Sequence, residues 1–304
     1  MLREQKIKWI TWIDWYDLEK KEIYNVLKEH DFHELDIEAC MEENQRARID
    51  SYEDYFFMVL HFPKYFLEEK KYELNEFNIF LKKDLLITFR SYPWLHVDKI
   101  FKKYEKQDFY DWEHCNKLYS WYILYEIIEA MLEKIFNTMS NTRKDLNLLE
   151  KIVFEKVNYK LINEIMIKKR NIIFLKHIFL PQVSVMRSTE SNINKIFNWE
   201  IEEYFEDLED KLMYIVNSIN ILEEHIISIE DAFKWIIDMN MNYIMKILTF
   251  FSALILPLTL ITSFYWMNVD LPMQGNTDFV YTLLVSSITL MILLYILMKK
   301  NWKF

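Results

Sequence analysis

The chain has 304 residues, a formal net charge of −10 and 52% hydrophobic residues, which is enough apolar material for the cores of one or two domains. Its single glycine, Gly275, excludes a glycine-rich phosphate loop, a dinucleotide fingerprint and a nucleophile elbow, which argues against nucleotide-binding and hydrolase classes. The negative charge speaks against nucleic acid as a partner and favours cations.

The amino-terminal part indicates a small α/β domain over residues 1–112. Helical patterns such as residues 17–30 separate three runs rich in β-branched and aromatic residues, which predict strands: residues 6–15, 54–63 and 77–89. The first residues are charged and contain no apolar signal core, and the two cysteines, Cys40 and Cys115, are isolated. We therefore expect this domain in the cytosol, with both thiols reduced.

Residues 113–246 have a helical pattern, and no proline or glycine occurs between Pro181 and Pro257. A helix that begins near Trp199 and continues into the apolar segment beyond residue 246 would be ~100 Å long. Residues 199–240 hold twelve acids against two lysines. A solvated helix face is the ordinary explanation. The alternative is a cation sensor, because acids brought together by oligomerisation would repel one another unless divalent cations neutralised them.

Two uncharged apolar segments follow, residues 247–267 and 279–298. As helices at ~1.5 Å per residue, each would span ~30 Å, the thickness of a bilayer core. Lys246 precedes the first segment and the basic tail, residues 299–304, follows the second, whereas residues 268–278 between them hold acids and no lysine or arginine. We therefore expect two transmembrane helices in the cell membrane, with both termini in the cytosol.

A stripe with 4-3 spacing runs up the long helix into the first apolar segment. Inside the segment the stripe is mostly small or hydroxylated, while the other faces carry isoleucine, leucine and phenylalanine. Two interpretations remain open, a helix–helix contact and a pore lining. Two helices per chain cannot enclose a channel, so a pore would require an oligomer. The stripe consists of Asp231, Trp235, Asp238, Asn242, Met245, Thr249, Ser252, Leu256, Thr259, Ser263 and Trp266.

The stretch NMNYIMKILTFFSALILPLTLITSFYWMNVDLP closely resembles the segment by which CorA-type divalent-cation (magnesium) transporters are known, with its MK-LT, LPLTLI and terminal Met-Asn elements. The segments YFFMVLHFPKY, NIFLKKDLLITF, LPQ and KKNWKF are similar too, so the resemblance covers nearly the whole chain. It implies an α+β membrane protein that forms a funnel-shaped homopentamer. An α/β domain, long stalk helices, an inner ring of first spans and an outer ring of second spans would build this funnel.

The resemblance also implies residue roles. Asn268 would hold a hydrated cation at the pore mouth, beside Met267, Trp266 and Asp270. Asp207, with the neighbouring Asp210, would bind a regulatory cation that holds the pore shut. Mg²⁺ dehydrates reluctantly, so amide and hydroxyl oxygens bonded to its water shell suit it. The conduction path would be lined by Asp231, Asp238, Asn242, Met245, Thr249, Ser252, Leu256, Thr259 and Ser263, with Leu256 and Met245 as dewetting constrictions.

The chain departs from the family's Gly-Met-Asn tripeptide, since it has Trp266-Met267-Asn268. Glycine lets backbones crowd the axis and adopt conformations that tryptophan reaches only at a cost. Five indoles could narrow the mouth, or Trp266 could join Tyr265 in the headgroup belt. The loop reads LPMQ where many members have Met-Pro-Glu, so the choice among Mg²⁺, Co²⁺, Ni²⁺ and Zn²⁺ stays open.

The sequence thus predicts a channel-type transporter that moves hydrated divalent cations down the membrane potential and is gated by cytosolic cations. The alternative is a non-conducting sensor or scaffold whose mouth is sealed by Trp266. We expect no enzyme, because no nucleophile–base pair is visible. Divalent cations are the expected substrate and regulatory ligand, no cofactor is expected, and the expected partners are copies of the chain and the lipid bilayer.

Overall fold

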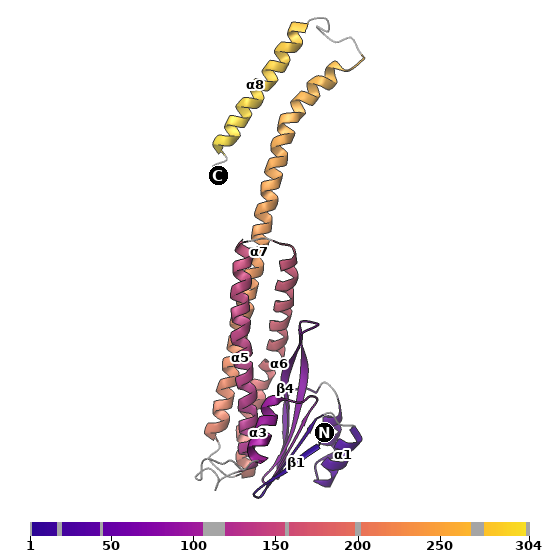
Figure 1. The fold of residues 1–304 in the computed structure, drawn as a ribbon, viewed down its shortest axis with the longest axis vertical. Helices are drawn as coiled ribbons and strands as arrows, with labels where there is room; N and C mark the ends of the chain where they lie inside the picture. Colours follow the sequence, from indigo (N-terminus) through magenta and orange to yellow (C-terminus); the bar gives the residue numbers. More distant parts are fainter. Residues whose placement is uncertain are drawn as a thin grey trace. The chain divides into compact units, whose positions relative to one another are not determined.

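The computed structural model describes residues 2–16, 20–42, 45–105, 119–155, 158–197, 202–268 and 277–301. The chain divides into two units, Met1–Ala232 and Phe233–Phe304. The first unit holds a sheet, the shorter helices and the beginning of a long helix, and the second holds the rest of that helix and the last one (Figure 1). The predicted boundary at residue 112 lies outside the described residues.

The first unit is built on one six-stranded sheet of order β1-β2-β6-β5-β4-β3. Strands β2 and β6 are parallel, and all other neighbours are antiparallel. The strands are β1 (Leu2–Ile7), β2 (Ile10–Tyr16), β3 (Arg48–Ser51), β4 (Tyr55–Phe66), β5 (Lys71–Lys82) and β6 (Leu85–Arg90).

Helices cover both faces of this sheet (Figure 1). One face is covered by α1 (Lys20–Glu29) and α2 (Glu34–Met41). The other is covered by α3 (Leu95–Glu105), α5 (Ser120–Glu155) and α6 (Lys160–Phe197). On the first face Phe80 stacks on Phe57, with ring centroids 4.5 Å apart, and on the second Phe77 packs against Trp94 at 5.2 Å. Burial on both faces explains why the central strands are nearly continuous apolar runs.

The strand prediction for residues 6–15 is wrong in detail, because this run folds as a hairpin. β1 pairs with β2 from Ile7↔Ile10 outwards, and Lys8 in the turn has a φ of 55°, in the left-handed region. A lysine and a tryptophan in a tight turn give none of the glycine, asparagine or aspartate signals on which hairpin prediction relies. Residues 77–89 likewise contain two strands, the second half of β5 and most of β6.

A buried charge cluster ties the first strands to α3. The Arg90 guanidinium donates to Asp14 Oδ2 at 2.7 Å and to Asp98 Oδ1 at 2.9 Å, and the Arg90 and Asp14 side chains are fully buried. Arg3 bonds to both carboxylates, and Thr88 donates to Asp14 Oδ1 at 2.8 Å. Burial alone would raise the pKa of Asp98, but the two arginines outweigh it and the pKa is lowered.

Helix α6 is fixed to the sheet through the backbone of β4. The His61 N–H donates to Gln182 Oε1, and Gln182 Nε2 donates to the His61 carbonyl, both at 2.9 Å. The pairing of β3 with β4 extends along β4 only as far as Val59, so the outer edge of β4 has no strand partner at His61. The buried Gln182 amide therefore replaces a strand at that point and protects the edge.

The long helix is α7 (Glu202–Tyr265), with 64 residues and therefore ~96 Å in length, which agrees with the length predicted. The predicted start at Trp199 lies outside the described residues. The last helix is α8 (Thr277–Asn301). By length and composition, α7 could cross a membrane, and the apolar stretch Thr277–Leu293 of α8 is shorter.

The charge cluster gives a stability prediction. Replacing Arg90 by alanine should lower the free energy of unfolding by about 3–5 kcal/mol, since the fully buried Asp14 would lose the fully buried one of its two arginine partners. The measurement is urea unfolding of the purified chain followed by tryptophan fluorescence. In the control, Arg48→Ala, the lost pair with Asp50 is more than one-third exposed and should cost less than about 1 kcal/mol. Equal losses in the two variants would contradict the prediction.

Candidate functional site

The predicted stripe lies along α7, and all its members are exposed in the single chain. Ten members belong to the helix itself, and Trp266 follows its last residue, Tyr265. Since most of α7 beyond residue 233 is exposed, exposure alone does not distinguish the stripe from the rest of the helix. The packing of α8 against α7 distinguishes the stripe from the other faces of the helix.

Within the second unit, α8 packs against one face of α7. The rings of Phe250 and Tyr295 lie 5.8 Å apart, and Ser287 and Met291 of α8 are buried. At 100° per residue, the centre of the half-buried face of α7 lies roughly 170° around the helix from the centre of the stripe within the apolar segment, Thr249 to Trp266. That face consists of Phe250, Ala253, Leu254, Pro257, Leu258, Ile261 and Tyr265. The chain's own second apolar helix therefore leaves the polar stripe uncovered.

The helix orients the two threonine hydroxyl groups of the stripe. Thr249 Oγ1 donates to the Met245 carbonyl at 2.8 Å, and Thr259 Oγ1 donates to the Ile255 carbonyl at 3.0 Å. The hydroxyl hydrogen is thus used inside the helix, and the oxygen keeps lone pairs that can accept a hydrogen bond. Acceptors of this kind suit a hydrated cation, whose bound waters point their hydrogens outwards.

The predicted mouth begins where α7 ends. The Trp266 N–H donates to the Thr262 carbonyl at 3.1 Å, so the backbone is still helical there. Among the described residues, positive φ values outside glycine occur only at Lys8, Asp31 and Lys70. The backbone at Trp266 therefore needs none of glycine's extra freedom. Met267 and Asn268 are also exposed, and Asp270 lies outside the described residues.

The acids of the first part of α7 are partly neutralised within the chain. Basic side chains of α6 pair with them along the two antiparallel helices: Lys169 with Glu230 at 2.6 Å, Lys176 with Glu223 at 2.5 Å and Arg187 with Glu209 at 2.7 Å. These ion pairs were not predicted from the sequence, although the seven-residue spacing of Lys169 and Lys176 matches that of Glu223 and Glu230. Divalent cations are therefore not needed at these three acids.

Asp207, one of the two predicted regulatory residues, has internal partners. Lys211 Nζ lies 2.6 Å from Asp207 Oδ2 and 2.5 Å from Glu129 Oε1, and the Tyr125 hydroxyl donates to Asp207 at 3.1 Å. Burial would lower the pKa of Lys211, but hydrogen bonds to Asp207 and Glu129 outweigh it and the pKa is raised. The ammonium therefore stays charged beside Asp207. Asp210 is exposed.

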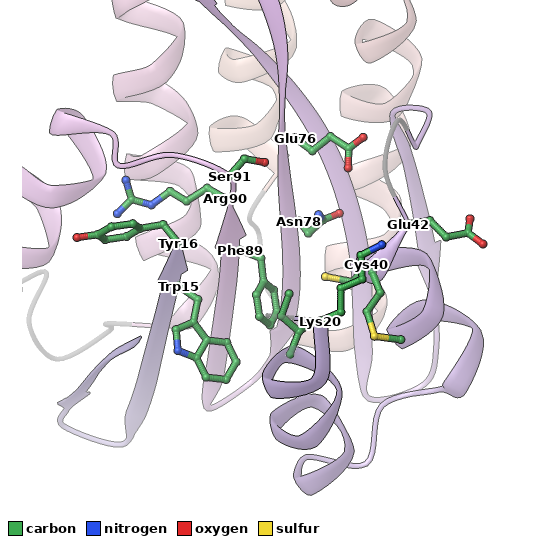
Figure 2. A pocket seen from close by; sticks show the side chains of 12 residues that line it. Trp15, Tyr16, Lys20, Cys40, Glu42, Glu76, Asn78, Phe89, Arg90 and Ser91 are labelled. Atoms are coloured by element: carbon green, nitrogen blue, oxygen red, sulfur yellow. The ribbon is translucent and has the colours of Figure 1, made fainter. Parts of the chain in front are cut away.

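A cavity of about 260 Å³ lies at the carboxyl ends of β2 and β6, the place where open α/β sheets commonly bind ligands. Figure 2 shows Trp15 and Phe89 on one side and Glu76 and Asn78 towards the other. Burial raises the pKa of the Cys40 thiol, which makes it a poor nucleophile. None of the residues predicted for the mouth, the path or regulation lines this cavity.

Comparisons with known proteins agree with this architecture. The cobalt/magnesium transport protein CorA of Thermotoga maritima is 22% identical over 295 residues, which cover 96% of this chain and 83% of that protein. The putative metal ion transporter YfjQ of Bacillus subtilis is 25% identical, covering 88% and 81%. The structure of the CorA magnesium transporter from Methanocaldococcus jannaschii matches with a TM-score of 0.78 and 21% identity, covering 95% of this chain and 90% of that one.

The structural match confirms an amino-terminal α/β domain, a long helical stalk and a carboxy-terminal helix. The model of the family described as CorA-like Mg²⁺ transporter protein matches residues 8–300. The expectation that the chain is not an enzyme is confirmed as well, since this is a family of transporters. The chain belongs to the CorA-like Mg²⁺ transporter family.

Proposed function

We propose that five copies of this chain form a homopentamer in the cell membrane, in which the α7 helices surround a path for hydrated divalent cations. The observation that carries the proposal is the position of α8, which packs on the face of α7 opposite the polar stripe. Polar side chains in a membrane span face protein or water rather than lipid. Because α8 covers the opposite face, the stripe is free to face the stripes of neighbouring copies, which supports this assembly.

The chemistry along the stripe suits a hydrated ion. Thr249, Ser252, Thr259 and Ser263 would present rings of hydroxyl oxygens to the water shell, and Leu256 would supply an apolar constriction between them. Rings of neutral oxygens match Mg²⁺, which keeps several of its waters. Outside the membrane, Asp231 and Asp238 would attract cations to the cytosolic end of the path, beside Asn242 and Met245.

The relatives indicate the cargo. Those from Thermotoga maritima and Methanocaldococcus jannaschii are cobalt/magnesium transport proteins, and the alignments cover 83% and 91% of their lengths. We infer that Mg²⁺ and Co²⁺ are the cations moved here, driven by the inside-negative potential. The spans would be residues 247–267 and 279–298, with residues 268–278 outside and the remaining parts, including the α/β domain, in the cytosol.

Trp266 falls on the same side of α7 as Thr259 and Ser263, away from the half-buried Tyr265, when the helical angle is continued by one residue. This position favours an indole at the mouth over an indole in the outer headgroup belt. Because an indole at this position could close the mouth, the second candidate function is a sensor or scaffold sealed by Trp266. Flux measurements on variants of the mouth distinguish the two functions.

We further infer that regulation by cations at Asp207 is in competition with Lys211. A divalent cation that binds this carboxylate must share it with, or displace, an ammonium group at 2.6 Å. The free acids of the stalk, such as Glu202, Glu206 and Asp210, are exposed and face no such competitor among the described residues. Binding between neighbouring copies would therefore begin at these acids and reach Asp207 at higher cation concentration.

The first prediction concerns assembly. The purified chain should be a pentamer in mild detergent, since a pore lined by one helix per chain requires several copies and the polar stripe must be covered. Native mass spectrometry measures the number of copies directly. A chain that stays a monomer or dimer under conditions in which its helical content is preserved would contradict the transport function.

The second prediction concerns the mouth. Asn268→Ala should lower Mg²⁺ flux about a hundred-fold or more, because each of five copies loses a hydrogen bond worth ~0.5–1 kcal/mol to the hydrated ion. Trp266→Gly should raise flux about ten-fold, corresponding to a barrier ~1.4 kcal/mol lower. Flux is measured in liposomes with an imposed inside-negative potential, and native mass spectrometry checks that both variants remain assembled.

The parent and Trp266→Gly separate the candidate functions. A silent parent beside a conducting Trp266→Gly variant would favour the sealed sensor or scaffold. If both are silent for Mg²⁺, Co²⁺, Ni²⁺ and Zn²⁺, the proposed transport function is wrong.

The third prediction concerns regulation. Lys211→Met should lower the Mg²⁺ concentration that protects the stalk from proteolysis, by up to about five-fold, since a partly exposed ion pair is worth at most ~1 kcal/mol. Asp207→Ala should raise that concentration. The control is Lys102→Met, which removes the same charge from an exposed lysine on α3. Identical protection curves for the parent, Lys211→Met and Asp207→Ala would exclude a regulatory cation at Asp207.

A further inference from the structure

The adjoining ends of α5 and α6 differ in charge from the rest of the molecule. Residues 143–170, called the α5–α6 tip below, contain eight lysines and arginines and four acids, whereas the whole chain has a net charge of −10. A positively charged segment of this size attracts anionic partners, whereas the acidic rest of the chain attracts cations.

Large apolar side chains are exposed on the same tip. Phe154 is 62% exposed and Tyr159 is 76% exposed, and Leu148, Ile152 and Met166 are exposed as well. Leu148 and Ile152 lie one turn apart, so they share a face of α5, and Lys144 and Lys151 lie at neighbouring positions of that face. Exposed apolar groups interleaved with cations are typical of surfaces that contact a membrane interface.

Four cations of the tip remain available for an external partner. Lys168 pairs with Asp145 at 2.8 Å, Lys169 pairs with Glu230, and Arg170 donates to the Lys70 carbonyl at 2.9 Å. Of the other five, Lys156 lies outside the described residues, and four are exposed and have no ion-pair partner in the described part of the chain: Arg143, Lys144, Lys151 and Lys160. Lys160 opens α6, where its N–H is capped by Asn158 Oδ1 at 3.0 Å, so its position is fixed by the helix.

The covalent chain keeps this tip within reach of the bilayer. The pair between Lys169 and Glu230 fixes the tip to α7, and Ile247, the first residue of the proposed span, follows Glu230 by 17 residues. Even a fully extended chain of that length reaches only ~60 Å. This bound holds for any arrangement of the two units, and such a tether raises the effective concentration of the membrane at the tip.

We propose that the α5–α6 tip docks on the anionic headgroups of the cytosolic leaflet, with its free lysines and Arg143 near phosphate groups and Phe154 and Tyr159 at the headgroup level. This inference rests on the proposed membrane location. Anionic lipids are the complementary partner, because they collect in the cytosolic leaflet. Each basic residue near them raises the affinity of the segment for the membrane by about five-fold. Aromatic residues beside cations are the pairing expected at the headgroup level.

The test compares the full chain in nanodiscs of phosphatidylcholine alone and of phosphatidylcholine mixed with phosphatidylglycerol. Hydrogen exchange of the peptide covering residues 146–155 should slow by at least about five-fold in the anionic discs, because docking suppresses local opening of the α5 end. Lys151→Glu with Lys160→Glu should abolish this difference. The matched control is Lys99→Glu with Lys102→Glu, which changes the net charge equally on exposed α3 positions and should retain it.

Exchange that is equal in the two lipids overturns the inference. So does protection that persists in lipid-free detergent, which would show that a neighbouring copy covers the tip. Mg²⁺ flux measured in parallel separates this inference from the proposed function. A conducting chain whose tip exchanges equally in both lipids contradicts only the lipid contact, and a silent chain whose tip is protected by anionic lipid contradicts only transport.

Discussion

The packing of α8 against one face of α7 decides what the rest of the second unit can do. Phe250 and Tyr295 meet on that face, and the buried Ser287 and Met291 belong to the same contact. A single apolar helix with one hydroxylated face would be a poor membrane span, because its polar face would meet lipid. Once α8 is placed on the opposite side, the polar face is left for water or for another chain, which in the proposed assembly is a neighbouring copy of α7. A contact inside one chain thus supports the proposed assembly.

Charge pairing has a different role in each layer of the first unit. In the sheet, Arg90 and Asp14 are fully buried, so each depends on the other and the cluster fixes how β1, β2, β6 and α3 meet. Between α6 and α7 the pairs are partly exposed and individually weak, but their shared register holds the two helices in one alignment. The acids that remain unpaired after this alignment are the ones available to cations from solution. The number of acidic residues in the stalk is therefore larger than the number of carboxylates at which a regulatory cation could readily bind.

The sequence predicted the helices beyond residue 112 well, because their periodicity extends over many residues and few glycines or prolines interrupt it. It predicted the sheet less well. The turn at Lys8 and Trp9 has no turn-forming residue, and β3 is a four-residue strand with little apolar character. Both exist because neighbouring strands hold them, which is a long-range effect that a local pattern does not contain. The hydrogen bond from Tyr125 to Asp207 was missed for the same reason, since the two residues lie far apart in sequence. Lys211, by contrast, lies only four positions from Asp207, a spacing that brings two side chains together on a helix.

Among the described residues of the single chain, the proposed site is an exposed helix face. The cavity beside β2 and β6 and a larger groove of about 960 Å³ between the β4–β5 hairpin, α3, α5 and α6 contain none of the residues of the stripe or the mouth. Those residues are spread along one face of a helix, with three or four positions between successive members. A concave site arises from a convex helix face only when several such faces surround an axis. The proposed site therefore rests on the spacing of side chains along α7, and neither of these two cavities of the single chain coincides with it.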